Sequence, residues 1–142
     1  MIRKMTAEDA TEVLQLEKDC FSRPWSEKDL AYEFSENPYS QIYVMEENGK
    51  IVGYYDMWVI FENAELARLA VDPKCRRKGY GWQLLEHCQK TAMEMGCETI
   101  GLEVRVSNDG AIALYRKADF TVINLKKMYY ETEDGLRMMK GI

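Results

Sequence analysis

The segment that decides the fold is RRKGYG, residues Arg76–Gly81. A predicted strand, Glu65–Val71, precedes it, and apolar residues recur at helical spacing after it as far as Gly96, a residue type that commonly ends helices. A helix N-terminus presents unpaired backbone N–H groups and the positive end of the helix dipole, and glycines let the backbone approach an anion closely. The segment therefore predicts a phosphate or pyrophosphate bound by the backbone amides of Arg77–Trp82.

The spacing of the glycines excludes two common phosphate-binding motifs. A Walker-type loop needs four residues between its glycines and a Lys-Ser/Thr pair after them, whereas only Tyr80 separates Gly79 from Gly81. A Rossmann fingerprint needs a third glycine at the position of Leu84. From these residues alone, the remaining alternative is a glycine-containing turn with solvated basic side chains.

Working outward, the chain predicts an α/β protein in which a mixed central sheet is flanked by helices. The first two helices begin at Thr6 and Ser26, each with an aspartate three residues later in a capping-box arrangement. Hairpin turns are expected at Asn48-Gly49 and Asp134-Gly135. The expected strands are Ile2–Met5, Gln41–Met45, Ile51–Ile60, Glu65–Val71, Thr99–Val106, Phe120–Tyr130 and Leu136–Met139, and the last helix is expected over Ala111–Lys117.

Length and composition indicate one ordered domain, residues 1–142, without repeats or linkers. The chain has 142 residues, of which 46% are hydrophobic and 30% charged, and this balance excludes a disordered chain. The longest apolar run, Met57–Phe61, is far shorter than the roughly 20 residues that a membrane-spanning helix needs. A net charge of −5 argues against nucleic acid as a partner and favours cationic substrates.

The cysteines argue against a metal or disulfide framework. There are four, no two of them spaced CxxC, and His87 is the one histidine, so a zinc site is not expected. The first twenty residues carry five acidic side chains, which fits neither a secretory signal nor a transit peptide. We therefore expect reduced cysteines in a cytoplasmic protein.

The spacing Arg76-x-x-Gly79-x-Gly81 matches the acetyl-CoA motif R/Q-x-x-G-x-G/A of the GCN5-related N-acetyltransferases. The stretches Leu69–Pro73, Leu102–Asn108 and Ala111–Tyr115 match this family as well, and the chain most resembles the branch that acetylates protein N-termini. The resemblance covers nearly the whole chain. It implies a single domain whose central strands splay apart, with acetyl-CoA as cosubstrate and no metal.

The resemblance also implies an acceptor, the N-terminal alanine of a small-subunit ribosomal protein. It implies neither direct nucleic-acid binding nor a membrane partner. Two alternatives stay open at this point. In the first alternative, the acceptor is a small amine or a lysine side chain. In the second, the chain is a non-enzymatic module that binds coenzyme A.

What the resemblance implies for the cofactor is a set of backbone and loop contacts. The strand before the motif pairs with the pantetheine arm, the motif itself holds the diphosphate, and Asn108 both caps a helix and contacts the cofactor. The implied cofactor-binding residues are Leu69, Ala70, Val71, Arg76, Arg77, Lys78, Gly79, Tyr80, Gly81, Trp82 and Asn108.

Two residues are the catalytic candidates. Glu103 lies on the polar side of an alternating strand, and the pattern alone favours an ion pair with Arg105 or another cation. The resemblance implies that Glu103 is the general base, acting through water. Tyr115 is, from the pattern, an aromatic packed against the sheet, and the resemblance makes it the general acid that protonates the leaving thiolate. Direct attack of the amine requires no covalent enzyme intermediate.

The acceptor side is expected in two aromatic loop regions, which match those that line the peptide groove in N-terminal acetyltransferases. The same aromatics are alternatively lids over the core. The candidate substrate-binding residues are Phe21, Pro24, Trp25, Tyr129 and Tyr130. The chain departs from the family pattern at Asp119, where the family has glycine, and at Arg68, where the branch has asparagine. Aspartate tolerates the left-handed backbone, so the turn at Asp119 is expected to survive, whereas Arg68 places a cation near the reactive strand.

Overall fold

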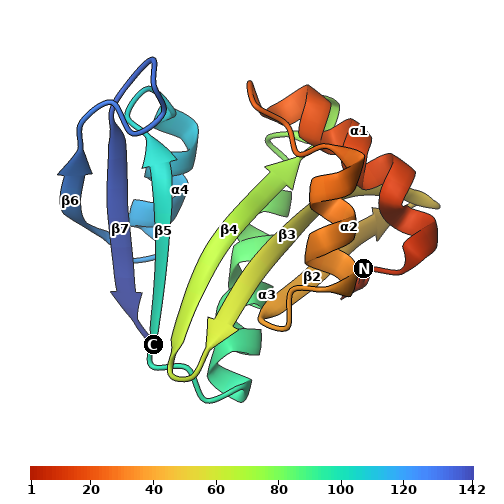
Figure 1. Ribbon diagram of the computed structural model, residues 1–142, viewed down its shortest axis with the longest axis horizontal. Coiled ribbons are helices and arrows are strands. Elements are labelled where there is room, and N and C mark those ends of the chain that lie inside the picture. Colours follow the sequence, from red (N-terminus) through yellow and green to blue (C-terminus); the bar gives the residue numbers. More distant parts are fainter.

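The structure, a computed structural model, describes residues 1–142 and contains one seven-stranded sheet in the order β1-β2-β3-β4-β5-β7-β6 (Figure 1). Its strands are β1 (Ile2–Lys4), β2 (Ser40–Glu47), β3 (Lys50–Ile60), β4 (Asn63–Val71), β5 (Thr99–Arg105), β6 (Thr121–Lys126) and β7 (Gly135–Gly141). Its helices are α1 (Ala10–Cys20), α2 (Glu27–Ser35), α3 (Tyr80–Glu94) and α4 (Asp109–Lys117), with short 3-10 helices η1 (Ala7–Asp9) and η2 (Pro73–Cys75). The mixed α/β architecture predicted from the sequence is confirmed.

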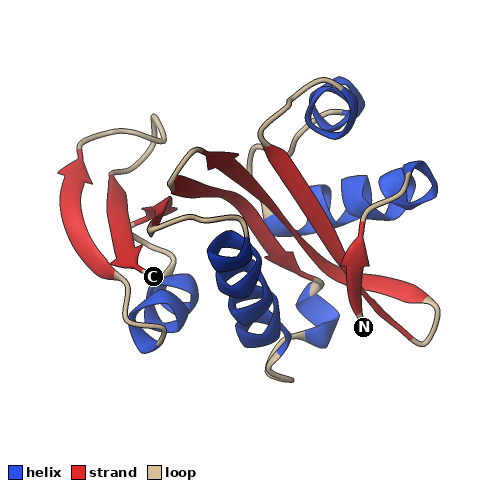
Figure 2. Cartoon of the chain, turned by 90° about the horizontal axis from the view of Figure 1, so that it is seen from below, coloured by secondary structure: helices blue, strands red, loops and turns tan.

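Helices cover both faces of the sheet. Figure 2 shows α1 and α2 on one face and α3 and α4 on the other. The α1–α2 face buries a small cluster that includes Val13, Leu16 and Leu30, whereas the α3–α4 face buries a larger one around Leu84 and Phe120. These clusters bury the apolar stripes that the helical and strand periodicities predicted.

The predicted helix starts and the first hairpin turn are confirmed. Both capping boxes are present. The Asp9 carboxylate accepts the Thr6 N–H, and the Ser26 hydroxyl accepts the Asp29 N–H. Asn48 and Gly49 have φ angles of 52° and 77°, which a tight hairpin between β2 and β3 requires. Asp119 also adopts a left-handed φ of 71°, so the turn expected to survive at that position does so.

The C-terminal part differs from the sequence prediction. The strand expected over Phe120–Tyr130 ends at Lys126, and a loop over 127–134 replaces the tight turn expected at Asp134-Gly135. Met128 and Glu131 have left-handed φ angles of 52° and 66°, which interrupt an extended strand. The Asp134 carboxylate accepts a hydrogen bond from the Met128 N–H at 2.8 Å and so closes the loop on itself. Helix α4 also begins two residues before the predicted start, at Asp109.

The sheet opens between β4 and β5. These strands form its one parallel pair, and their pairing covers only Asn63–Glu65 against Thr99–Gly101. The β3–β4 register shifts beyond this point, leaving Ala67 as an extra residue, and such a bulge bends and twists a strand. In Figure 1, β4 and β5 start close together near the C-terminus and diverge toward α4 and α1. The strands implied to splay therefore do so.

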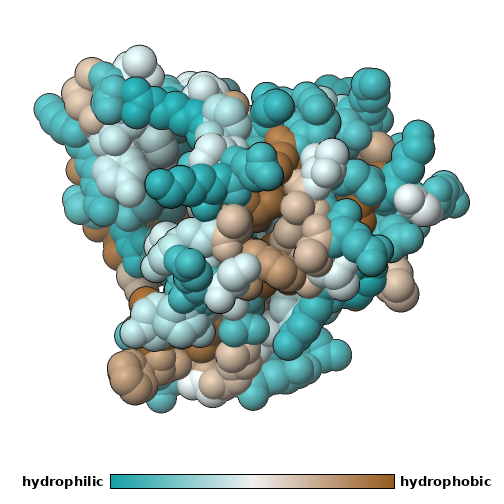
Figure 3. Space-filling model, turned by 45° about the vertical axis from the view of Figure 1, so that its right-hand side comes forward, coloured by the Kyte–Doolittle hydropathy of each residue, from teal (hydrophilic) through white to brown (hydrophobic).

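The surface is mostly polar. Figure 3 shows one face on which hydrophilic side chains cover most of the rim, while hydrophobic ones gather around the centre and the lower edge. None of the helices combines the length and the apolar composition that crossing a membrane requires.

A buried pair of carboxyl groups lies between α2 and the sheet. Trp58 donates its indole N–H to Glu33 at 2.6 Å, and Ser40 donates its hydroxyl to Asp56 at 2.6 Å. Burial, and next the neighbouring Glu33, raise the pKa of Asp56 to about 9. Asp56 is therefore protonated near neutral pH, and the two neighbouring carboxyl groups together hold one proton, with Asp56 Oδ2 buried and without a side-chain hydrogen-bond partner.

The shared proton predicts a pH-dependent stability. Folded Asp56 keeps its proton up to about pH 9, whereas an unfolded aspartate loses it near pH 3.8, so stability falls as pH rises toward 9. Asp56→Asn is neutral at every pH and removes this slope, which is at most about 1.4 kcal/mol per pH unit. We expect urea unfolding between pH 6 and 9 to show the slope in the wild type only.

Asp29→Asn is the matched control for this prediction. The hydrogen bonds from Ser26 lower the pKa of Asp29, so its contribution to stability is lost only as pH falls. Its removal leaves the slope between pH 6 and 9 unchanged. Equal slopes for the wild type and Asp56→Asn would contradict the shared proton.

Candidate active site

The predicted anion site is a run of unpaired backbone amides. No N–H group from Arg76 to Trp82 donates a hydrogen bond within the protein, while Cys75 and Gln83 on either side donate to Asp72 and Gly79. Arg77 and Gly79 adopt left-handed φ angles of 67° and 80°. Alternating backbone conformations of this kind turn successive N–H groups toward one concavity, which suits an anion. The geometry matches the expectation from the sequence, and the occupant stays a prediction.

The open edge of β4 comes shortly before the unpaired amides of Arg76–Trp82, which we call the amide cradle. Leu69 and Val71 are only half-buried, and their stretch of β4 has no strand partner on the β5 side. The Val71 carbonyl accepts hydrogen bonds from the Cys20 thiol and from Arg76 Nε, both at 3.3 Å. Ala70 faces the other way and is buried against α1 and α2. This stretch of β4 thus offers an extended main chain with no strand partner on the β5 side, and its Val71 carbonyl is already bonded to Cys20 and Arg76.

Close packing of α3 against α4 positions the cradle beside the second catalytic candidate. A Cβ added at Gly81 would lie 3.4 Å from the Leu114 side chain, an ordinary contact distance, so α3 and α4 pack directly against each other here. Tyr115 is buried, with its ring 5.8 Å from that of Phe120. Burial raises the pKa of Tyr115, which keeps the phenol protonated near neutral pH. Asn108 caps α4 by accepting the Ala111 N–H at 3.1 Å.

Glu103 projects from β5 on the α1–α2 side of the sheet. Its Oε1 accepts hydrogen bonds from Lys126 Nζ at 2.9 Å and from Arg137 Nη1 at 3.4 Å. Its Oε2 is buried and has no partner. The ion pair that the strand pattern favoured is present, but its cations are Lys126 and Arg137 and not Arg105. The unpaired oxygen remains available to accept a proton.

Arg105 instead joins the two aromatic loops. Its guanidinium donates to Ser22 at 3.0 Å and to Glu133 at 3.3 Å, and it lies 4.4 Å from the centre of the Tyr130 ring. Burial raises the pKa of Tyr130 to about 12, with further contributions from Tyr129 and Glu103. A neutral phenol therefore lies beside Glu103.

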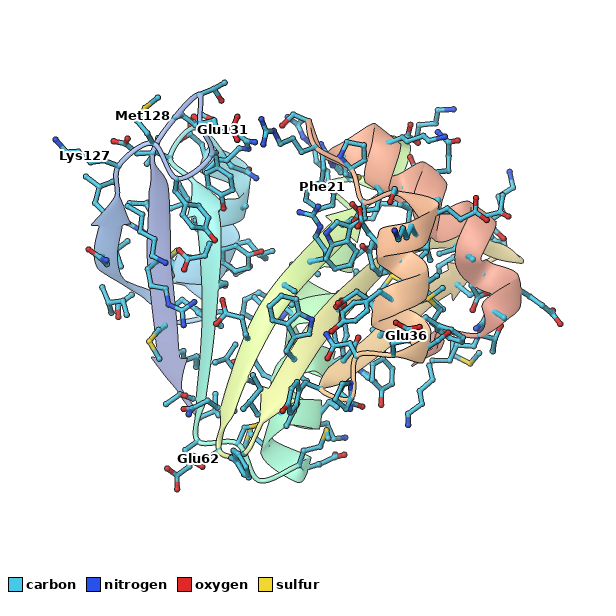
Figure 4. All side chains as sticks on the ribbon, in the orientation of Figure 1. Phe21, Glu36, Glu62, Lys127, Met128 and Glu131 are labelled. Carbon is cyan, nitrogen blue, oxygen red and sulfur yellow. The ribbon has the colours of Figure 1, made fainter.

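The structure brings the two predicted substrate loops together. The α1–α2 loop carries Phe21, Pro24 and Trp25, and the β6–β7 loop carries Tyr129 and Tyr130, whose rings meet edge to face 4.9 Å apart. Arg23 and Glu131 form an ion pair between the loops. Figure 4 shows Phe21 and Glu131 on opposite sides of the opening between β4 and β5. All five residues therefore lie on two loops that face each other at the wide end of the opening.

Arg68 supports the α1–α2 loop. Its guanidinium lies 4.3 Å from the centre of the Phe21 ring and 4.6 Å from that of the Trp25 ring, and it donates to the Arg23 carbonyl at 3.1 Å. Glu17, which is 0% exposed, pairs with Arg68 at 3.3 Å and accepts the Trp25 N–H at 2.7 Å. The guanidinium of Arg68, the residue at which the sequence departs from the branch pattern, is thus held by contacts within the protein while its side chain stays 20% exposed.

Sequence reasoning missed several members of this arrangement. The ion pairs of Arg105, Arg137 and Glu17 join segments that are far apart in the chain, so no local spacing of residues predicts them. One signal was available, namely Gly101 inside an otherwise regular strand, because an interior glycine often marks a close approach of another group. No group of three or more His, Cys, Asp or Glu side chains is placed to hold a metal ion.

Comparison with known proteins identifies the class. Residues 10–120 match the model of the acetyltransferase (GNAT) family, and the chain belongs to this family. A curated relative, the [ribosomal protein bS18]-alanine N-acetyltransferase of Escherichia coli strain K12, is 34% identical over 134 residues, which cover 94% of this chain and 89% of the relative.

Solved structures agree with this assignment. The crystal structure of the ribosomal-protein-S18-alanine N-acetyltransferase from Escherichia coli matches with a TM-score of 0.93 and 32% identity, covering 100% of this chain and 93% of that one. The PaiA N-acetyltransferase from Thermoplasma acidophilum, solved with coenzyme A, shares the fold, with a TM-score of 0.87, 21% identity, and coverage of 100% and 98%.

Proposed function

We propose that this chain is an acetyl-CoA-dependent N-terminal acetyltransferase whose acceptor is the N-terminal alanine of a ribosomal protein of the small subunit. One observation carries the proposal. The unpaired amides of Arg76–Trp82 follow the open edge of β4, which diverges from β5, the strand that carries Glu103. The name of the similar Escherichia coli enzyme supports this choice of acceptor.

The residues present fit the donor. A diphosphate needs several converging N–H donors, and the Arg76–Trp82 amides supply them without breaking an existing hydrogen bond. An amide-containing arm needs an extended edge, which Leu69, Ala70 and Val71 provide. Asn108, at the start of α4, is a further proposed contact, and so are the side chains of the basic segment.

The proposed chemistry is direct transfer. A neutral amine attacks the thioester carbonyl, the carbon–sulfur bond breaks, and the amide product and coenzyme A leave. The amine proton passes, through water, to the unpaired Oε2 of Glu103, and Tyr115 donates its proton to the departing thiolate. An α-amine with a pKa of about 8 is far more often neutral near pH 7 than a lysine side chain with a pKa near 10.4.

The proposed acceptor groove lies between the two aromatic loops. Phe21, Pro24 and Trp25 are assigned to one wall and Tyr129 and Tyr130 to the other, on the two loops whose members Phe21 and Glu131 lie on opposite sides of the opening in Figure 4. Because Arg68 and Arg105 hold these walls in place through cation–π contacts, the groove is preformed. A preformed groove lowers the entropy lost on binding a flexible peptide terminus.

The role of the Arg76–Trp82 amides in binding the diphosphate is tested by a substitution at Gly79. Gly79→Ala forces alanine into the left-handed conformation, which costs about 1–2 kcal/mol, so coenzyme A should bind about five- to thirtyfold more weakly by calorimetry. Gly49→Ala is the matched control, because Gly49 has a similar φ in the distant β2–β3 hairpin. Gly49→Ala should bind coenzyme A with the same affinity as the wild type. Equal affinities for all three proteins would place the diphosphate elsewhere.

The acceptor is tested with competing amines. The wild-type enzyme is given acetyl-CoA with a peptide that begins with alanine, an N-terminally blocked peptide with an internal lysine, or a polyamine. We expect mass spectrometry to show acetylation of the free alanine terminus well above the other two. Faster turnover of the lysine peptide or the polyamine would overturn the assignment in favour of a different acceptor class.

The catalytic pair is tested by two conservative substitutions. Glu103→Gln removes the proton acceptor and Tyr115→Phe the proton donor, and each should lower kcat by about 100-fold or more. Affinity for coenzyme A, measured in parallel, should not change, because neither side chain belongs to the amide cradle. If both variants bind the cofactor and turn over at the wild-type rate, the assigned roles are wrong.

A further inference from the structure

Arg137 crosses β5 to reach β4. In the β5–β7 register it lies opposite Glu103, yet its Nη1 donates to Glu65 of β4 at 2.6 Å. The guanidinium passes over Gly101, where an added Cβ would lie 2.8 Å from Arg137 Cζ. Gly101 and Glu65 form the last parallel pair before the strands diverge. Arg137 therefore spans the sheet where the opening begins.

The same guanidinium also holds one oxygen of Glu103. Arg137 Nη1 lies 3.4 Å from Glu103 Oε1, and Lys126 Nζ lies 2.9 Å from the same atom. Two cations thus hold Oε1, whereas Oε2 is buried and has no partner, so the two oxygens have different surroundings. A carboxylate held at one oxygen presents the other in a defined direction, as proton transfer requires.

We propose that Arg137 is a positioning residue for the acetyl transfer: by crossing β5 over Gly101 and bridging Glu65 to Glu103, it aims Glu103 Oε2 at the attacking amine. This inference rests on the proposed function and adds a residue to it. Arg137 does not touch the reacting atoms itself. It acts through Glu103, and its reach to Glu65 prevents its guanidinium from rotating with the carboxylate.

The charged groups around Glu103 come from four parts of the chain. Arg137 of β7 and Lys126 of β6 bind it directly, Glu65 of β4 lies on the far side of Arg137, and Tyr130 of the β6–β7 loop is close enough for Glu103 to raise its pKa. Removing the Arg137 charge leaves one cation on Oε1 and lets the carboxylate turn.

Arg137→Met is the first variant, and Arg3→Met is its matched control. Arg3 likewise bridges two acids, Asp9 and Glu46, but lies at the sheet edge far from the groove. We expect Arg137→Met to lower kcat for the alanine-terminated peptide by about 10- to 100-fold, the usual cost of a small misplacement of a reacting group. The KM for acetyl-CoA should stay constant, and Arg3→Met should keep the wild-type kcat.

Gly101→Ala is the more specific test of the Arg137 position because it retains every charge. Its Cβ displaces only the flexible end of Arg137, so the fold should persist while kcat falls as in Arg137→Met. The Gly101→Ala/Arg137→Met double variant should lose no more than either single one, since both act on the same contact. In a Glu103→Gln background, Arg137→Met should cost nothing further in kcat.

The outcomes separate this inference from the proposed function. If the wild type does not acetylate the peptide, the proposed function fails. If the wild type is active but Arg137→Met and Gly101→Ala both match Arg3→Met in kcat, the positioning role is wrong. An additional loss in the Glu103→Gln background would also overturn it, because Arg137 would then act by another route.

Discussion

The end of hydrogen bonding between β4 and β5 is the constraint on which the site depends. The strands pair only as far as Glu65 and Gly101, and the bulge at Ala67 bends β4 away beyond that point. Further pairing would fill the opening with main-chain hydrogen bonds. Because pairing stops, the edge of β4 keeps unpaired groups, and β4 leads to the unpaired amides that follow Cys75. The proposed donor site, the proposed acceptor groove and the candidate Glu103 are all assigned to this gap.

Ion pairs connect the elements on the two sides of the gap. Arg137 ties β7 to β4 and β5, while Arg68 connects β4 to the α1–α2 loop through Glu17. Such partly buried pairs contribute more to orientation than to net stability. The two oxygens of Glu103 have different surroundings, since Oε1 is ion-paired and Oε2 is buried without a partner. The ion pair that the strand pattern favoured and the general-base role that the family resemblance implies, which remains a proposal, therefore concern different atoms of one carboxylate.

Local signals predicted most of the fold. The capping boxes at Thr6 and Ser26, the Asn48-Gly49 turn and the element order were all readable because each depends on residues only a few positions apart. The prediction failed over residues 127–134, where the left-handed angles of Met128 and Glu131 fall on residue types that do not signal them. The Asp134 cap that closes this loop reaches back six residues, beyond the range of turn patterns.

For the site, the sequence by itself determined the segment with the greatest anion-binding tendency and the family, because glycine spacing and a helix start are local properties of Arg76–Gly81. The partners of each charge were decided only by the tertiary structure. Glu103 pairs with Lys126 and Arg137 and not with Arg105, since strand order places β7 beside β5 and β6 beyond it. Coulombic pairing depends on distance in space, and that distance is set by how the sheet assembles rather than by separation along the chain.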